Sequence, residues 1–151
     1  MLSVGDPRID LELPDIRGRI QSLAQFDGAP LIINFWATWC PPCVRELPML
    51  DSWHSRRDTD GTAVLAIALD ADTAAVVKFV EDNALTLPVW IAPTGTVDTS
   101  TRFGNRRSVL PYSVLLGADG RVLAQRAGEL DEQLLAEWAK LASRHSATEK
   151  L

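Results

Sequence analysis

The feature that most constrains the fold is an apolar strand followed closely by the start of a helix. Residues 31–36 (Leu-Ile-Ile-Asn-Phe-Trp) are mostly β-branched or aromatic, which is typical of a strand buried on both faces. From Pro41 onwards the apolar residues recur with helical spacing, at Cys43, Leu47 and Leu50. A buried strand that leads directly into a helix is the basic unit of α/β proteins.

The rest of the chain continues this alternation, and Asp119-Gly120 is a strong hairpin signal. The further strands are expected around Leu11 and Leu13, near Ile20, and over Ala63–Leu69, Pro88–Ile91, Tyr112–Leu116 and Arg121–Ala127; the further helices are expected after Asp72, over Val97–Phe103 and from Asp131. Pro48 should kink the helix that begins at Pro41. The pattern predicts one α/β domain with a mixed sheet over residues 1–151, with loose ends at about 1–6 and 146–151.

Composition excludes several classes of protein. Apolar residues make up 46% and charged residues 23%, which is globular composition. The net charge of −5 disfavours nucleic acid as a partner, because phosphate binding relies on a basic surface. No apolar run approaches the roughly 18 residues of a membrane span, so we expect no membrane segment in this form and leave open an anchor or leader ahead of Met1. With only two cysteines, a framework of structural disulfides is excluded.

The two cysteines, Cys40 and Cys43, lie in the motif Trp-Cys-Pro-Pro-Cys where the strand gives way to the helix. Their spacing lets them close a small disulfide, and the first sulfur meets unpaired N–H groups that stabilise a thiolate. The same spacing also forms half of a zinc site. No second cysteine pair exists, and His54 and His145 are poorly placed to complete one, so we expect no metal.

The segment Asn34–Cys43 closely resembles the active-site segment of the thioredoxin superfamily, and the resemblance extends over nearly the whole chain. The opening hairpin and the helix after Asp70 resemble the TlpA-type branch. The resemblance implies a thioredoxin fold, a three-layer α/β/α sandwich with a central mixed sheet, an N-terminal β-hairpin and an extra central helix. Proteins of this branch are extracytoplasmic thiol–disulfide oxidoreductases, often membrane-tethered, and some reduce apocytochrome c before haem attachment.

The resemblance implies that Cys40 is the nucleophile and Cys43 the resolving thiol. Glu46 matches an acidic residue of the branch that tunes the cysteine pair and can accept a proton; the alternative is an exposed helix charge beside Arg45. Asn34 stands where thioredoxins carry a buried carboxylate, so that proton acceptor is missing. The favoured interpretation of Asn34 is an amide that satisfies buried backbone groups.

Substrate contacts are also implied by the resemblance. Pro111 matches the cis-proline of the superfamily, which would let Leu110 pair with an extended substrate segment; a trans proline at a strand start is the alternative. Trp39, with Pro41 and Pro42, is expected to form an exposed apolar rim that a protein substrate covers.

Two further expectations concern the surroundings of the site. Trp36 is expected in the core. Residues Asn105, Arg106 and Arg107 lie in a segment slightly longer than the family usually has, and we expect them to project beside the site as a solvated loop.

The implied function is a thiol–disulfide oxidoreductase that acts as a reductant on protein disulfides, with cytochrome c maturation as one such role. The expected partners are protein substrates and a redox donor protein. No cofactor is expected besides the redox-active Cys40–Cys43 disulfide. The expected form is a monomer in the periplasm or another extracytoplasmic location. One alternative is a non-catalytic, redox-responsive binding module or chaperone that uses the same rim. Another is a peroxiredoxin-like peroxidase, whose site wants Thr three residues before the reactive cysteine, where Ala37 stands.

Overall fold

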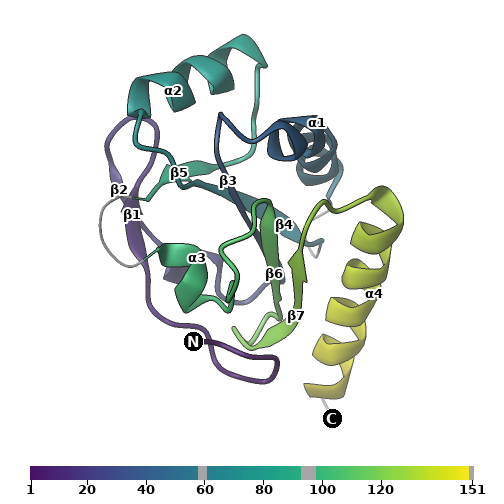
Figure 1. Cartoon of the computed structure of the whole chain (residues 1–151). Helices are drawn as coiled ribbons and strands as arrows, with labels where there is room; N and C mark the ends of the chain where they lie inside the picture. The colour runs from purple at the N-terminus through teal and green to yellow at the C-terminus, as the bar shows by residue number, and fades with distance from the viewer. Residues whose placement is uncertain (58–60, 93–97, 150–151) are drawn as a thin grey trace.

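The computed structural model describes residues 1–57, 61–92 and 98–149 of the chain. The strands of the central sheet are β3 (Leu31–Trp36), β4 (Ala63–Ala68), β5 (Val89–Ile91), β6 (Tyr112–Leu116) and β7 (Val122–Ala127). Their order is β5-β4-β3-β6-β7; β3, β4 and β5 run parallel, and β6 and β7 are antiparallel to their neighbours (Figure 1). The predicted mixed sheet is therefore confirmed.

A small second sheet and the helices complete the fold. The sheet pairs β1 (Glu12–Pro14) with β2 (Ile20–Ser22), and a 3₁₀ helix follows over Leu23–Phe26. The helices are α1 (Pro41–Arg56), α2 (Thr73–Asp82), α3 (Thr99–Arg102) and α4 (Glu132–Glu149). The predicted N-terminal hairpin and the extra helix after Asp70 are thus present. Within the described ranges, no helix is long and apolar enough to cross a membrane.

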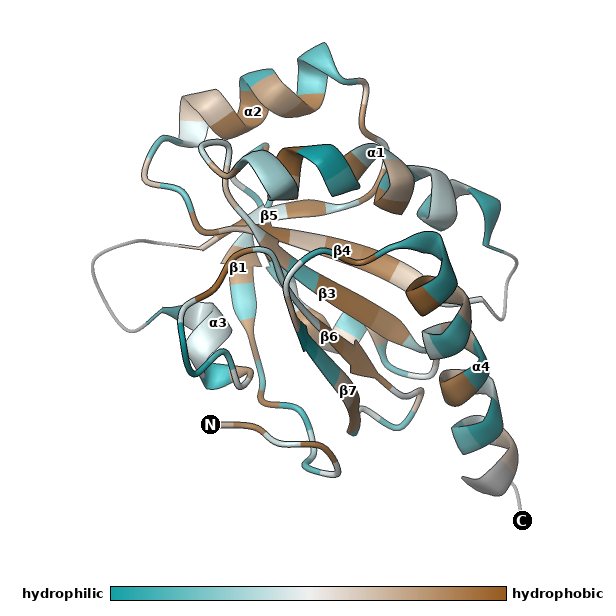
Figure 2. Cartoon of the chain, turned by 45° about the vertical axis from the view of Figure 1, so that its right-hand side comes forward, coloured by the Kyte–Doolittle hydropathy of each residue, from teal (hydrophilic) through white to brown (hydrophobic). Residues whose placement is uncertain are grey.

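The central sheet separates two apolar cores and so gives the fold three layers. On one face it packs against α1, α2 and α4, through residues such as Leu47, Val76 and Trp138. On the other face it packs against the N-terminal segment and α3, through residues such as Leu13 and Phe103. Figure 2 shows the hydrophobic strands β3 and β4 between these layers. The layered architecture predicted from the sequence is confirmed.

Strand β3 is buried along its whole length and carries the buried amide of Asn34. Successive side chains of a strand point to opposite faces of the sheet. Ile32 and Trp36 belong to the core beneath α1, whereas Ile33 and Phe35 belong to the core on the other face. The alternation therefore directs Asn34 toward α1. Trp36 is fully buried, as predicted.

Element boundaries differ from the predicted ones where side chains cap helices. Helix α3 is shorter than predicted because the Asp98 carboxylate accepts the Ser100 N–H and starts the helix at Thr99; Val97 lies outside the described residues. Helix α4 begins one residue later than predicted, with Asp131 accepting the Leu134 N–H. Helix α1 is continuous through Pro48.

The sequence predicts loose segments at both ends of the chain, where the structure has hydrogen bonds near the N-terminus and helix near the C-terminus. Near the N-terminus, the Leu2 N–H donates to the Arg102 carbonyl at 3.0 Å, and the Gln125 side chain donates to the Leu2 carbonyl at 2.9 Å. Near the C-terminus, α4 continues to Glu149 and includes residues 146–149.

Candidate active site

The two cysteines form a disulfide at the N-terminus of α1, directly after the loop that follows β3. Cys40 is the N-cap residue of α1 and Cys43 lies in the first turn, with their Cα atoms 5.3 Å apart. Cys40 retains 4% of its surface exposure, whereas Cys43 is completely buried. Of the two cysteines, only Cys40 therefore keeps any surface that a partner can reach. In the described part of the chain, no three His, Cys, Asp or Glu side chains are grouped as metal ligands.

Apolar residues surround the accessible side of the disulfide. Trp39 is 67% exposed, Pro41 is exposed and Pro42 is half-buried. The Leu110–Pro111 peptide bond is cis, as predicted, and Leu110 is half-buried. Because Tyr112 of β6 pairs with Phe35 of β3, this proline lies at the same end of the sheet as the cysteine loop. The residues predicted to contact substrate therefore share one end of the molecule.

Glu46 is a buried acid behind Cys43. It is only 2% exposed, which rules out the alternative of an exposed helix charge. Its Oε1 accepts a hydrogen bond from Asn34 Nδ2 at 2.6 Å, and its Oε2 accepts the Leu130 N–H at 2.8 Å. Burial raises the pKa of Glu46 to about 7, and the nearby Glu129 charge adds to this rise, while the two hydrogen bonds oppose it. Glu46 is therefore poised to gain or lose a proton near neutral pH.

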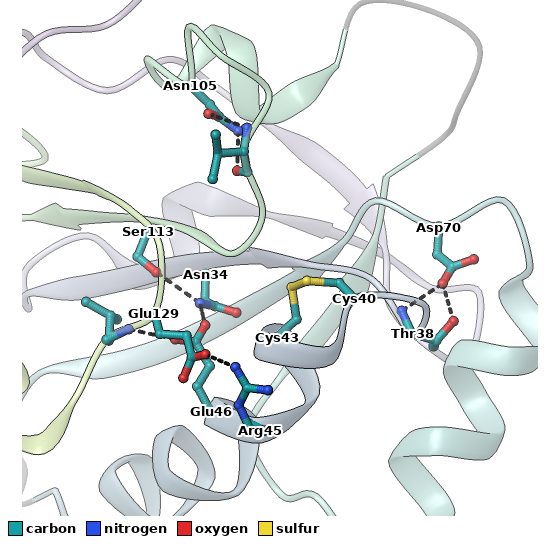
Figure 3. Close-up of a disulfide and its surroundings, with 12 residues drawn as sticks. Asn34, Thr38, Cys40, Cys43, Arg45, Glu46, Asp70, Asn105, Ser113 and Glu129 are labelled. Carbon is teal, nitrogen blue, oxygen red and sulfur yellow. Dashed lines mark hydrogen bonds and ion pairs between the residues drawn. A yellow bond between two sulfur atoms is a disulfide. The ribbon is translucent and has the colours of Figure 1, made fainter.

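The Asn34 side chain on β3 donates hydrogen bonds to Glu46 and to a second side chain, not to backbone groups. Its Nδ2 donates to Glu46 Oε1 and, at 2.9 Å, to Ser113 Oγ on β6 (Figure 3). The hydrogen bonds of Asn34 run to side chains, so the expectation that its amide satisfies buried backbone groups is wrong. Ser113 is a site residue that the sequence analysis missed; its signal is a serine in a buried strand whose other residues are aromatic or aliphatic.

A second contact holds the loop ahead of Cys40. The Thr38 N–H and hydroxyl both donate to Asp70 Oδ2, at 3.0 and 2.5 Å, and the Asp72 N–H donates to Asp70 Oδ1. Burial opposes ionisation of Asp70, but these hydrogen bonds outweigh it and lower the pKa of Asp70. The loops after β3 and β4 are thereby tied together, a role for Asp70 that the sequence analysis missed.

The loop before Leu110 differs from the expectation at one residue. Asn105 is 2% exposed and does not project, because its Nδ2 donates to Ser100 Oγ and the Val109 carbonyl, and its Oδ1 accepts the Val109 N–H. Arg106 and Arg107 are exposed. Asn105 therefore closes the loop, and of the three residues expected to project only Arg106 and Arg107 face solvent.

Comparison with known proteins supports the fold and the site together. Residues 4–125 match the AhpC/TSA family. The thiol-disulfide oxidoreductase ResA of Bacillus thuringiensis is 30% identical over 139 residues, which cover 92% of this chain and 78% of that protein.

Solved structures agree with this comparison. A structure assigned to a DsbE-type thiol:disulfide interchange protein of Chlorobium tepidum has a TM-score of 0.78 and 28% identity, covering 97% of this chain and 98% of the other. A secreted thiol-disulfide isomerase of Corynebacterium glutamicum has a TM-score of 0.79 and 26% identity, covering 89% of this chain and 84% of the other.

The fold and the paired cysteines at the start of α1 define a thioredoxin-like protein with a redox-active disulfide. Within that superfamily, the chain belongs to the AhpC/TSA family and to its TlpA/ResA/DsbE-type thiol-disulfide oxidoreductases.

Proposed function

We propose that this protein reduces disulfide bonds in extracytoplasmic protein substrates, with apocytochrome c as one substrate class. The observation that carries the proposal is the Cys40–Cys43 disulfide, with Cys40 on the accessible side and Cys43 buried behind it. Relatives named as thiol-disulfide oxidoreductases, and a secreted isomerase among the similar structures, support the activity and the location.

The reaction follows from the order of the two sulfurs. In the dithiol form, the Cys40 thiolate attacks a substrate disulfide and forms a mixed disulfide, releasing one substrate thiolate. The Cys43 thiolate then attacks the Cys40 sulfur, which releases the second substrate thiolate and re-forms the internal disulfide. Two electrons pass to the substrate, and a redox donor protein returns the pair to the dithiol. The cysteine pair is the only redox group that this cycle needs.

Substrate recognition is assigned to the exposed rim. Trp39 and Pro41 offer apolar surface beside Cys40, and Leu110 offers backbone groups ahead of cis-Pro111. An extended segment that contains a cystine would lie across this end of the sheet, with apolar contacts beside the disulfide. The proposed functional form is a monomer.

The test is insulin-disulfide reduction combined with trapping. The wild type should reduce insulin, and Cys43→Ser should accumulate mixed disulfides through Cys40, because the attacking thiol survives while the resolving thiol is lost. Cys40→Ser is the matched control and should trap far less. Preferential trapping through Cys43 would reverse the assigned roles.

The same assay separates the alternatives. A redox-responsive binding module or chaperone would bind unfolded protein but leave insulin disulfides intact. A peroxidase would consume hydroperoxide, but Ala37 supplies no hydroxyl three residues before Cys40, and the Thr38 hydroxyl is already bonded to Asp70. The geometry therefore favours disulfide exchange.

A further inference from the structure

A buried acceptor near the disulfide has no partner in the oxidised protein. Asn34 is completely buried, and its Nδ2 donates to both Glu46 and Ser113. Its Oδ1 finds no hydrogen-bond partner among the described residues. Figure 3 shows this oxygen pointing away from Glu46, toward the side on which Cys43 lies. Because an unpaired buried acceptor is costly, it indicates a group that is paired in another state of the protein.

Reduction supplies such a partner. When the disulfide takes up two electrons and two protons, Cys43 gains an Sγ–H, which is a hydrogen-bond donor. Cys43 is completely buried, so this donor needs an acceptor inside the protein. The free Oδ1 of Asn34 is suited to that role.

The two oxygens of Glu46 are not equivalent toward a proton. Oε2 accepts the Leu130 backbone N–H, a donor that cannot reverse its polarity. A proton on the carboxyl group therefore belongs on Oε1. There it would face the hydrogens of Asn34 Nδ2, so that two hydrogen-bond donors would point at each other with no acceptor between them. A half-turn of the amide exchanges its nitrogen and oxygen at almost constant shape and removes the conflict. Ser113 permits both orientations, because a hydroxyl can donate or accept.

We propose that the Asn34 amide is a two-position link between Glu46 and Cys43, a proposal that rests on the disulfide exchange described above. With Glu46 ionised, Nδ2 donates to Glu46 and Oδ1 accepts from the Cys43 thiol. With Glu46 protonated, Oδ1 accepts from Glu46 and Nδ2 donates to the Cys43 thiolate. The proton that Cys43 gives up as it becomes the resolving nucleophile is matched by one that Glu46 Oε1 gains. Asn34 itself exchanges no proton and is a positioning residue.

The charged surroundings are compatible with this exchange near neutral pH. In the described part of the chain, the titratable and charged groups around Glu46 are the two cysteines at the start of α1 and the ion pair between Arg45 and Glu129. The positive charge of Arg45 is engaged by Glu129 at the surface. The pKa of Glu46, raised by burial to about 7, lets both orientations of the amide be populated.

The first test uses the reduced wild-type protein and needs no variant. Nuclear Overhauser contacts from the Asn34 side-chain NH₂ should reach the Glu46 side chain above its pKa and shift toward the Cys43 β-protons below it. An NH₂ that keeps the same contacts across the Glu46 titration would overturn the proposal. Insulin reduction, measured on the same sample, shows separately whether the proposed function holds.

The second test is a double-mutant cycle on the thiol titration. Gln at position 46 can accept from Leu130 and donate to Asn34, so Glu46→Gln should hold the amide in its thiolate-binding orientation. It should lower the pKa of Cys43 by about one unit in an otherwise wild-type protein, the size of one hydrogen bond to a charge. In an Asn34→Leu background the same change should shift the pKa by less than about 0.3 unit. Ser113→Ala, which leaves both ends of the link intact, is the matched control and should retain the full shift. Equal shifts in all three backgrounds would mean that Glu46 acts on Cys43 without Asn34, and the proposal would fail.

Discussion

At the scale of single residues, the burial of Glu46 sets its chemistry. An ionised carboxylate inside a protein loses most of its hydration, and the two hydrogen bonds that Glu46 receives replace only part of it. The same side chain one position earlier on the helix would be exposed, as Arg45 is. The helical phase of position 46 therefore decides between a surface charge and a buried acid.

This burial makes stability depend on pH. The pKa of Glu46 is about 7 in the folded protein, whereas its ordinary value of 4.5 applies to the unfolded chain. Between pH 4.5 and about pH 7 the folded state therefore binds this proton more tightly than the unfolded state does. Raising the pH through this window should lower the free energy of unfolding of the wild type, relative to Glu46→Gln, by about 3 kcal/mol. Urea unfolding of the oxidised proteins at about pH 4 and about pH 8 measures the difference.

The exposed acid Glu132 provides the control for this experiment. Glu132→Gln removes the same charge from the surface of α4 and should leave the pH dependence of the wild type almost unchanged. If Glu46→Gln and the wild type lose stability in parallel as the pH rises, folding does not raise the pKa of Glu46.

At the scale of elements, the first turn of α1 determines how well the Cys40 thiolate is stabilised. The side chain of an N-cap residue accepts hydrogen bonds from the N–H groups two and three residues later. The residue two positions after Cys40 is Pro42, which has no N–H. Only the Cys43 N–H, three positions later, is therefore left to donate to the Cys40 sulfur. The helix start is therefore a weak donor site compared with one that lacks proline.

Restoring the missing N–H tests this account. Pro42→Ala should lower the pKa of Cys40 by about one unit, because the thiolate gains a second backbone donor. The reduction potential should rise by up to about 30 mV, the change that corresponds to a tenfold shift of this two-electron equilibrium. Thiolate absorbance and equilibration with glutathione buffers measure the two quantities.

Pro41→Ala is the matched control. It also removes a proline, but it restores the N–H of the first helical residue, which an N-cap side chain does not reach. Its effect on the Cys40 pKa should be much smaller. Equal effects of the two variants would assign the change to loop flexibility rather than to a hydrogen bond.

The sequence predicts those elements whose signals are local. The apolar run of β3 and the paired cysteines at the helix start are both visible over a few residues, which is why the sheet and the disulfide were predicted. Asn34 is visible in the sequence as a polar residue in an apolar strand, but its partner Ser113 is 79 residues away. The Asp70 and Leu130 contacts likewise depend on how distant loops meet, which local patterns do not specify.

At the scale of the whole molecule, the reduction potential of the cysteine pair and the stabilities of the oxidised and reduced folds are related by one thermodynamic cycle. A weakly stabilised Cys40 thiolate and a nearby acid both disfavour the dithiol state relative to the disulfide. We therefore expect the oxidised protein to unfold at a higher urea concentration than the reduced protein at neutral pH. The corresponding reduction potential should be nearer to about −270 mV than to the roughly −120 mV of a strong oxidant.

Two measurements check this expectation independently. Urea unfolding of the oxidised and reduced forms gives the stability difference, and equilibration with glutathione gives the potential. A reduced form that is the more stable of the two, or a potential above about −180 mV, would contradict the assignment as a reductant.

The exposed indole of Trp39 has a practical consequence for following this protein. It stands next to Cys40 in the chain and is 67% exposed, whereas Trp36 is fully buried and Trp90 nearly so. Disulfides quench the fluorescence of adjacent indoles, and a solvated indole emits at longer wavelength than a buried one. Trp53 is half-buried and also contributes to the long-wavelength emission, so the redox-dependent change in that emission is what reports the state of the cysteine pair, without a dye or a label.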